Sequence, residues 1–156
     1  SGGVSAFKKS VLEQCGGFPT GLGMSGKKTG YGEETLLQVR MRMLGCVIGF
    51  DPHLQIDHVV APYKLSVWWF VKTSYLRGTH YWDVYDDKAT VWKLFKILLE
   101  AGGLSLAHLF AYASRLEQQR YYVQNWIIDA SRIPATRLGQ VAGGIRQLCA
   151  RRRSVS

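Results

Sequence analysis

Two adjacent carboxylates, Glu33 and Glu34, are a candidate pair for acid–base catalysis. A carboxylate at the mouth of a cleft can act as a general base and remove a proton from a hydroxyl group. The pair also opens a segment with helical spacing, where each negative charge stabilises a helix N-terminus by about 0.3–1 kcal/mol at an exposed site. From spacing alone, this second interpretation is the stronger one.

Cationic side chains lie on both sides of the pair. Lys27 and Lys28 belong to a glycine-rich stretch, residues 18–31, whose composition predicts a loop. Such a loop can close over a bound substrate and bring positive charge to a diphosphate, or it can be an ordinary solvated loop. Arg40 can reach a phosphate, although an ion pair with a carboxylate is the more ordinary role.

His58 is a candidate metal ligand, because a neutral imidazole binds divalent ions. The adjacent Asp57 can orient the ring only if the chain bends, since successive side chains of a strand point to opposite faces. A lone histidine is often structural instead. His53, His80 and His108 are expected to be structural or surface residues.

Short helices and strands must position these groups. The predicted elements are helices at residues 8–15 and 33–44 and strands at residues 47–50 and 54–60. Glycines at positions 16, 17 and 45 end the helices, because glycine readily takes the left-handed conformation. The turn-forming sequence Asp51-Pro52-His53 joins the two strands.

Beyond Pro62 the pattern becomes long and helical. The predicted helices span residues 66–77, 90–100, 104–120, 121–130 and 135–150. We interpret residues 63–156 as a helical extension of residues 1–62, not as a second independent domain. The apolar stretch at residues 101–114 is too short to cross a bilayer unaided, since a spanning helix needs about 20 residues.

Aromatic and cationic residues mix in this extension. The aromatic ones are Trp68, Trp69, Phe70, Tyr75, Tyr81, Trp82 and Trp92, and the cationic ones are Lys72, Arg77, Lys93 and Lys96. This mixture is typical of helices that lie in a bilayer interface, where cations meet anionic lipid. Ordinary packing onto a core is the alternative, and it is the stronger interpretation for the residues before Tyr85.

The whole composition indicates a folded, basic protein. Hydrophobic residues make up 47% of the 156 residues, which is enough for a core, and the formal net charge is +9. This charge favours an anionic partner, such as a nucleotide-sugar pyrophosphate, an acidic membrane or nucleic acid. The three cysteines form no zinc-ligand pattern and are odd in number, so we expect a reducing, cytoplasmic compartment.

An ordered set of short motifs resembles the second half of the family-2 glycosyltransferases. It comprises, in order, Gly2-Gly3, Phe7-Lys8-Lys9, Gly16-Gly17-Phe18, the glycine-rich loop, Gly32-Glu33-Glu34-Thr35-Leu36, Arg40, Gly45, a strand, Asp51-Pro52 and His58. The family typically shows GG followed by F-R-R, then GGF, then G-E-D-x-E-L, then D-P and a histidine. The resemblance covers about the first sixty residues, and its specificity lies in the order and spacing of the set.

The resemblance implies an α/β fold, the carboxy-terminal portion of a GT-A nucleotide-diphospho-sugar transferase, for residues 1–62. It implies that Glu34 is the general base, although the family usually has an aspartate there, and that Glu33 is its partner. Lys27, Lys28 and Arg40 would meet the donor phosphates, and His58 would join a divalent cation, Mn or Mg. The family's Asp-x-Asp pair is not present, so most of the cation site is expected from a nucleotide-binding half outside this chain.

The function implied is inverting transfer of a sugar from a nucleotide-sugar donor to a hydroxyl acceptor, either a glycan or a lipid-linked molecule. An anionic membrane surface is a further expected partner, so the protein is expected in the cytoplasm and at the cytoplasmic face of a membrane. The alternative is a non-catalytic membrane-surface or assembly module derived from such an enzyme. Nucleic-acid binding ranks last, because only positive charge suggests it.

Overall fold

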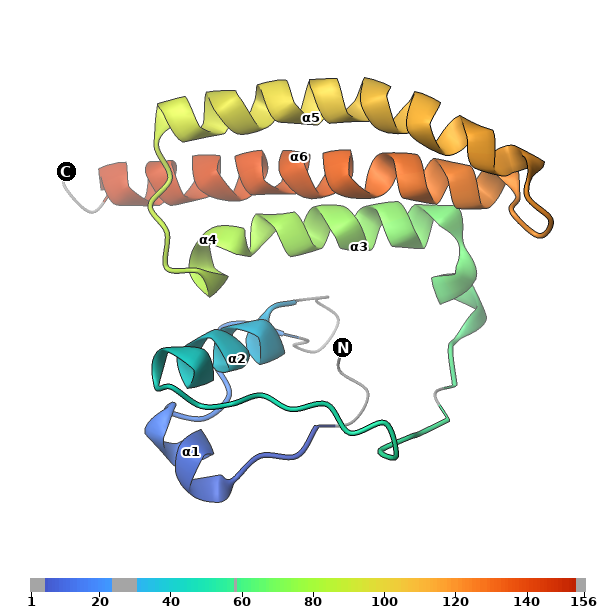
Figure 1. Cartoon of the computed structure of the whole chain (residues 1–156). Coiled ribbons are helices and arrows are strands. Elements are labelled where there is room, and N and C mark those ends of the chain that lie inside the picture. Colours follow the sequence, from blue (N-terminus) through green and yellow to red (C-terminus); the bar gives the residue numbers. More distant parts are fainter. Residues whose placement is uncertain (1–4, 24–30, 58, 154–156) are drawn as a thin grey trace. The chain divides into compact units, whose positions relative to one another are not determined.

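The computed structural model describes residues 5–23, 31–57 and 59–153 (Figure 1). The chain divides into two compact units, Ser1–Val60 and Ala61–Ser156, close to the boundary expected after residue 62.

The first unit contains two short helices. Helix α1 spans Lys9–Gln14 and helix α2 spans Glu33–Met43. Gly16, Gly17 and Gly45 follow them with φ angles of 74°, 72° and 74°, which is the left-handed region where a residue with a Cβ is disfavoured. The predicted helix ends are therefore correct to within one or two residues.

The helices of this unit share a small apolar core. Its buried members are Cys15, Leu37 and Met41, and Phe7, Val11, Leu12 and Cys46 pack around them. The Arg40 guanidinium donates a hydrogen bond to the Cys15 carbonyl oxygen at 3.1 Å. Because Cys15 directly follows α1, this bond ties the end of α1 to α2.

The prediction of an α/β fold is wrong. Every regular element in the described residues is a helix, and residues 46–57 and 59–60 contain no strand. The predicted turn is present, since the His53 amide donates to Asp51 Oδ1 at 2.9 Å. A strand requires a neighbouring strand to accept and donate its backbone hydrogen bonds, and no described segment provides one, so Val47 and Phe50 stay 96% and 90% exposed.

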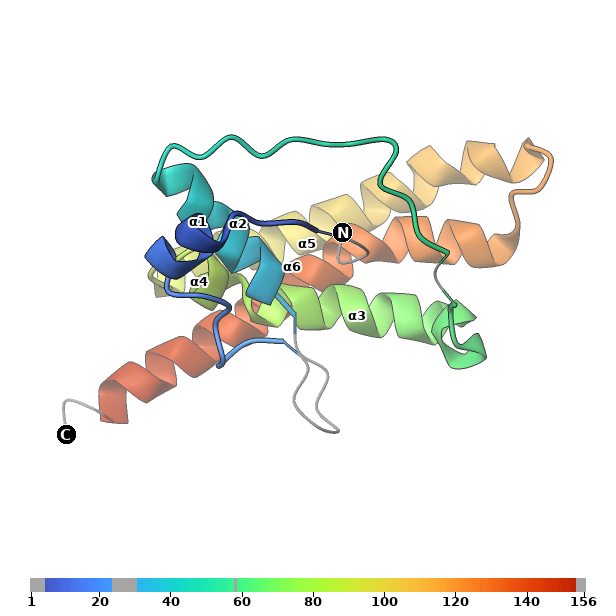
Figure 2. The same ribbon diagram turned by 90° about the horizontal axis from the view of Figure 1, so that it is seen from below.

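The second unit is a single layer of three long helices. They are α3 (Val67–Thr79), α5 (Val91–Ala113) and α6 (Val123–Arg153). Helix α6 packs against both others and lies between them, as the views in Figures 1 and 2 agree. The short elements η1 (Pro62–Leu65), α4 (Tyr81–Val84) and η2 (Ser114–Glu117) connect or extend these helices.

Two of the long helices are longer than the sequence predicts. Helix α5 continues through Gly102 and Gly103, and α6 continues through Pro134, where separate helices were expected. A proline inside a helix removes one backbone hydrogen bond. Pro134 is buried in α6, so packing against the neighbouring helices compensates for the lost bond.

Helices α3 and α6 approach each other through glycines. A Cβ on Gly139 would overlap the Tyr75 carbonyl oxygen, and one on Gly78 would overlap that of Thr136. Gly143 lies in the same way against Thr79. Small residues allow backbones to come this close, as they do where helices pack in membranes, and the contact therefore rests on backbone rather than on large apolar side chains.

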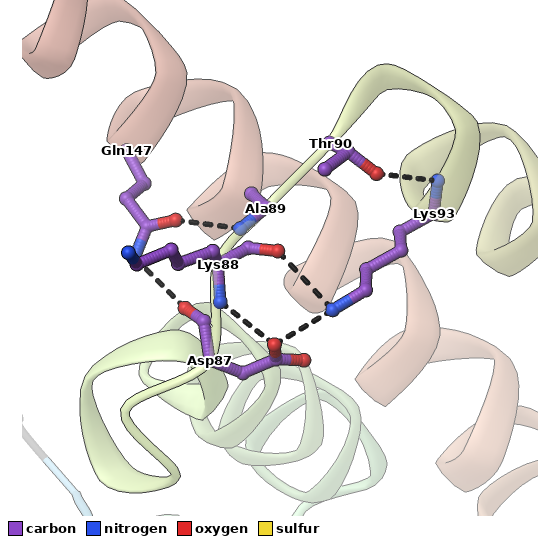
Figure 3. Close-up of polar contacts among 6 residues, drawn as sticks. All are labelled: Asp87, Lys88, Ala89, Thr90, Lys93 and Gln147. Atoms are coloured by element: carbon purple, nitrogen blue, oxygen red, sulfur yellow. Dashed lines mark hydrogen bonds and ion pairs between the residues drawn. The ribbon is translucent and has the colours of Figure 1, made fainter.

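A polar latch joins the loop before α5 to α6 (Figure 3). The Ala89 amide donates to Gln147 Oε1 at 2.8 Å, and Gln147 Nε2 donates to the Asp87 carbonyl oxygen at 3.1 Å. Lys93 Nζ donates to Asp87 Oδ1 at 2.7 Å. The latch fixes the point at which the chain turns from α4 into α5.

Candidate functional site

The two candidate catalytic carboxylates lie in the first turn of α2. Gly32 precedes them with a φ of 106°, a conformation that glycine adopts without strain, and it forms the N-cap of the helix. Both side chains are half-buried, and neither is hydrogen-bonded or ion-paired to any other described residue. The first backbone N–H groups of a helix have no intrahelical acceptor, so this end of α2 favours negative charge.

The Glu33 carboxylate lies against the glycine-rich stretch. A Cβ built on Gly23, whose φ is 88°, would lie 2.8 Å from Glu33 Cδ and 3.0 Å from its Oε1. The absence of a side chain at position 23 therefore makes room for the carboxylate. Glu33 is held beside this backbone, while Glu34 has no comparable neighbour among the described contacts.

Arg40 has a structural contact in this unit. Its guanidinium binds the Cys15 carbonyl oxygen, which is neither a phosphate nor the carboxylate that its more ordinary role suggests. Seven residues separate Arg40 from Glu33, or about 10 Å along a helix axis at 1.5 Å per residue. The structure thus places Arg40 two turns away from the carboxylate pair.

Three of the predicted site residues, Lys27, Lys28 and His58, lie outside the described residues. Among residues 5–23, 31–57 and 59–153, no group of three or more His, Cys, Asp or Glu side chains could hold a metal ion. The cation and the role of His58 stay predictions from the family resemblance.

The aromatic residues of the extension divide into two sets. Trp82 is 2% exposed, and its Nε1 donates to the Gln140 carbonyl oxygen at 2.7 Å. Trp68 and Trp92, by contrast, are 71% and 62% exposed. Packing onto a core thus accounts for Trp82 but not for the two exposed rings.

A second polar cluster closes the turn between α5 and α6. The Tyr121 hydroxyl donates to Asp129 Oδ2 at 2.9 Å, and Arg115 Nη1 lies 3.7 Å from the same oxygen. Burial raises the pKa of Tyr121, and the hydrogen bond to Asp129 raises this pKa further. The tyrosine therefore stays neutral and acts as a donor that holds the turn.

The sequence interpretation missed a continuous apolar face on α5. The helix segment Val91–Glu117 is long and apolar enough to cross a membrane. Only 11% of its most apolar stretch is buried in the structure. By length and composition alone this is weak evidence of a membrane span. The signal that could have revealed the face is the spacing of Trp92, Leu99, Leu106 and Phe110.

No protein-family model, curated protein or solved structure significantly matches this chain. The resemblance to family-2 glycosyltransferases therefore rests on the motifs in the sequence alone.

Proposed function

We propose that this chain is the acceptor-side part of an inverting sugar transferase, with Glu34 as the general base. The observation that carries the proposal is the pair Glu33 and Glu34, which occurs in the expected order of motifs and lies in the first turn of α2. Glycine-rich backbone flanks the pair through Gly23 and Gly32. The proposal does not depend on the α/β fold that the motifs implied.

The two carboxylates have different roles in this proposal. Glu33 orients the adjacent backbone, because its carboxylate lies against Gly23. Glu34 accepts the proton of the acceptor hydroxyl as that oxygen attacks the anomeric carbon of the donor sugar. The bond from the anomeric carbon to the diphosphate oxygen breaks, and the nucleoside diphosphate leaves from the opposite face with inversion.

The leaving diphosphate needs positive charge as the bond breaks. Lys27 and Lys28 are the proposed source in this chain, since they belong to the loop that the motif order places before the carboxylates. Arg40 stays a predicted phosphate contact, and its Nη1 also donates a hydrogen bond to the Cys15 carbonyl oxygen. No step is assigned to a divalent cation.

The test is a Glu34→Gln variant of the intact native gene product, assayed for release of nucleoside diphosphate from a panel of nucleotide sugars. We expect kcat to fall by roughly 10²–10⁴-fold, the usual contribution of general base catalysis, while donor affinity is kept. Glu34→Asp should retain part of the activity, since it keeps the carboxylate and matches the residue usual in the family.

Glu13→Gln is the matched control. Glu13 lies in the same unit, on α1, and its exposed carboxylate is 3.8 Å from Lys9 Nζ, so its loss should leave kcat unchanged. Full activity of a folded Glu34→Gln variant would remove the base assignment. A wild-type protein that releases no diphosphate from any donor in the panel would contradict the transferase itself.

A further inference from the structure

Helix α5 exposes one apolar face along its whole length. Trp92, Leu99, Leu106 and Phe110 are 62%, 61%, 62% and 78% exposed. They follow one another by seven, seven and four residues, so at 3.6 residues per turn they share one side of the helix. Leu94 and Ala101, which are buried, lie on the opposite side, where α5 packs against α6.

This face, which we call the α5 outer face, carries almost no charge. From residue 97 to residue 114 the only charged side chain of α5 is Glu100, and its carboxylate lies 3.3 Å from the Arg137 guanidinium of α6. The charge is thereby partly neutralised at the side of the helix. Phe95, Leu98 and Leu109, 39–49% exposed, widen the apolar surface.

A cation paired with an aromatic ring stands at the Trp92 end of the face. Lys96 Nζ lies 5.3 Å from the centre of the Trp92 ring, and Lys96 follows Trp92 by four residues, so both side chains are on the same side of the helix. Aromatic rings and long cationic side chains are enriched at the headgroup level of membranes, where the cations meet anionic lipid. The net charge of +9 adds to this attraction.

We propose that the α5 outer face is a membrane-docking surface that lies in the boundary between headgroups and acyl chains of an anionic bilayer. The docking is independent of the transferase chemistry proposed above. In the docked state, lipid acyl chains cover the large apolar side chains that the single layer of helices leaves exposed to solvent.

The helix lies along the bilayer and does not cross it. Helix α6 packs alongside α5 and carries Arg132, Arg137 and Arg146. If α5 crossed the bilayer, α6 would bring these arginines into the hydrocarbon, which strongly disfavours charge. An in-plane position keeps α6 at the polar side.

The experiment is co-sedimentation of the 156-residue chain with vesicles of phosphatidylcholine, with and without 30% phosphatidylglycerol. We expect binding to the anionic vesicles that weakens as salt increases. Phe110→Ser should lower the partition coefficient by about tenfold, because a large apolar side chain no longer enters the boundary region. Phe50→Ser is the matched control, since Phe50 is 90% exposed in the other unit, and it should bind as wild type does.

Fluorescence and topology measurements complete the test. Brominated lipid should quench the emission of the wild-type chain more than that of a Trp92→Phe variant, since the ring lies at headgroup depth. The proposal is overturned if the chain fails to bind anionic vesicles at low salt, or if Phe110→Ser and wild type bind alike. It is also overturned if α5 proves to have its two ends on opposite sides of the bilayer, or if Phe110→Ser abolishes self-association while lipid binding is unchanged.

Discussion

The same residue type has opposite roles at different points of the second unit. Gly139 on α6 lies against the Tyr75 backbone of α3, whereas a Cβ on Gly103 of α5 would meet nothing within 4 Å. Glycine in a helix interior costs about 0.8–1 kcal/mol relative to alanine. That cost is offset at position 139 by the close helix contact, but packing offers no such compensation at position 103.

A pair of alanine substitutions tests this difference. We expect Gly139→Ala to lower the free energy of unfolding by about 1–3 kcal/mol, because the added methyl group forces α3 and α6 apart. Gly103→Ala should be neutral or stabilise by up to about 1 kcal/mol. Urea denaturation followed by circular dichroism measures both, and equal effects of the two substitutions would contradict the close approach of α3 and α6.

At the scale of elements, side-chain hydrogen bonds determine where α5 begins. The Thr90 hydroxyl accepts a hydrogen bond from the Lys93 amide at 3.2 Å, a typical N-cap, and the latch holds the preceding residues against Gln147. The pKa of Asp87 lies below its ordinary value of 3.8, chiefly because Lys93 Nζ donates a hydrogen bond to its carboxylate. The Lys88 amide, which also donates to this carboxylate, lowers the pKa further.

The contribution of the latch to stability therefore depends on pH. A carboxylate whose pKa is lowered in the folded state stabilises the fold at a pH above its unfolded pKa, and this stabilisation is lost as the pH falls through the folded pKa. We expect Asp87→Asn to lower the melting temperature slightly at pH 7, with a difference from wild type that shrinks once the pH drops below about 3.8 and then disappears. Thermal melts of both proteins across this range measure the difference, and a constant gap at all pH values would rule out the carboxylate as its cause.

In the whole molecule, the two units differ in how accessible their backbone is to proteases. Residues 61–153 are almost entirely helical, with backbone hydrogen bonds inside the helices. Residues 46–57 and 59–60 have no regular structure and carry highly exposed side chains, including Val47, Phe50 and Val59. Such a segment adapts more easily to the extended conformation that a protease requires.

Limited proteolysis tests this contrast. We expect chymotrypsin to cut first after Phe50, leaving a fragment that contains the intact three-helix layer. Mass spectrometry of early time points identifies the cut. A first cut after Phe95 or Phe110, both exposed but within α5, would show instead that this helix opens more readily than the extended segment.

Features that depend on local interactions could be predicted from the amino-acid sequence. The glycines at 16, 17 and 45 ended α1 and α2 as predicted, because a left-handed φ is a property of the single residue. The predicted helix at residues 66–77 corresponds to α3, and the Asp51-Pro52-His53 turn forms through a bond between near neighbours. The pair Glu33 and Glu34 was likewise located correctly at the start of a helix, whose N-terminus favours negative charge.

Features that depend on partners far away in the chain could not be predicted from local sequence patterns. The two predicted strands were wrong because a strand needs hydrogen bonds from another segment, and local apolar alternation does not supply them. Helix α6 continues through Pro134, and α3 approaches it at Gly139, because of packing between residues far apart in the chain. The exposed face of α5 follows from the same cause, since α6 covers one side of that helix and the single layer leaves the other side open.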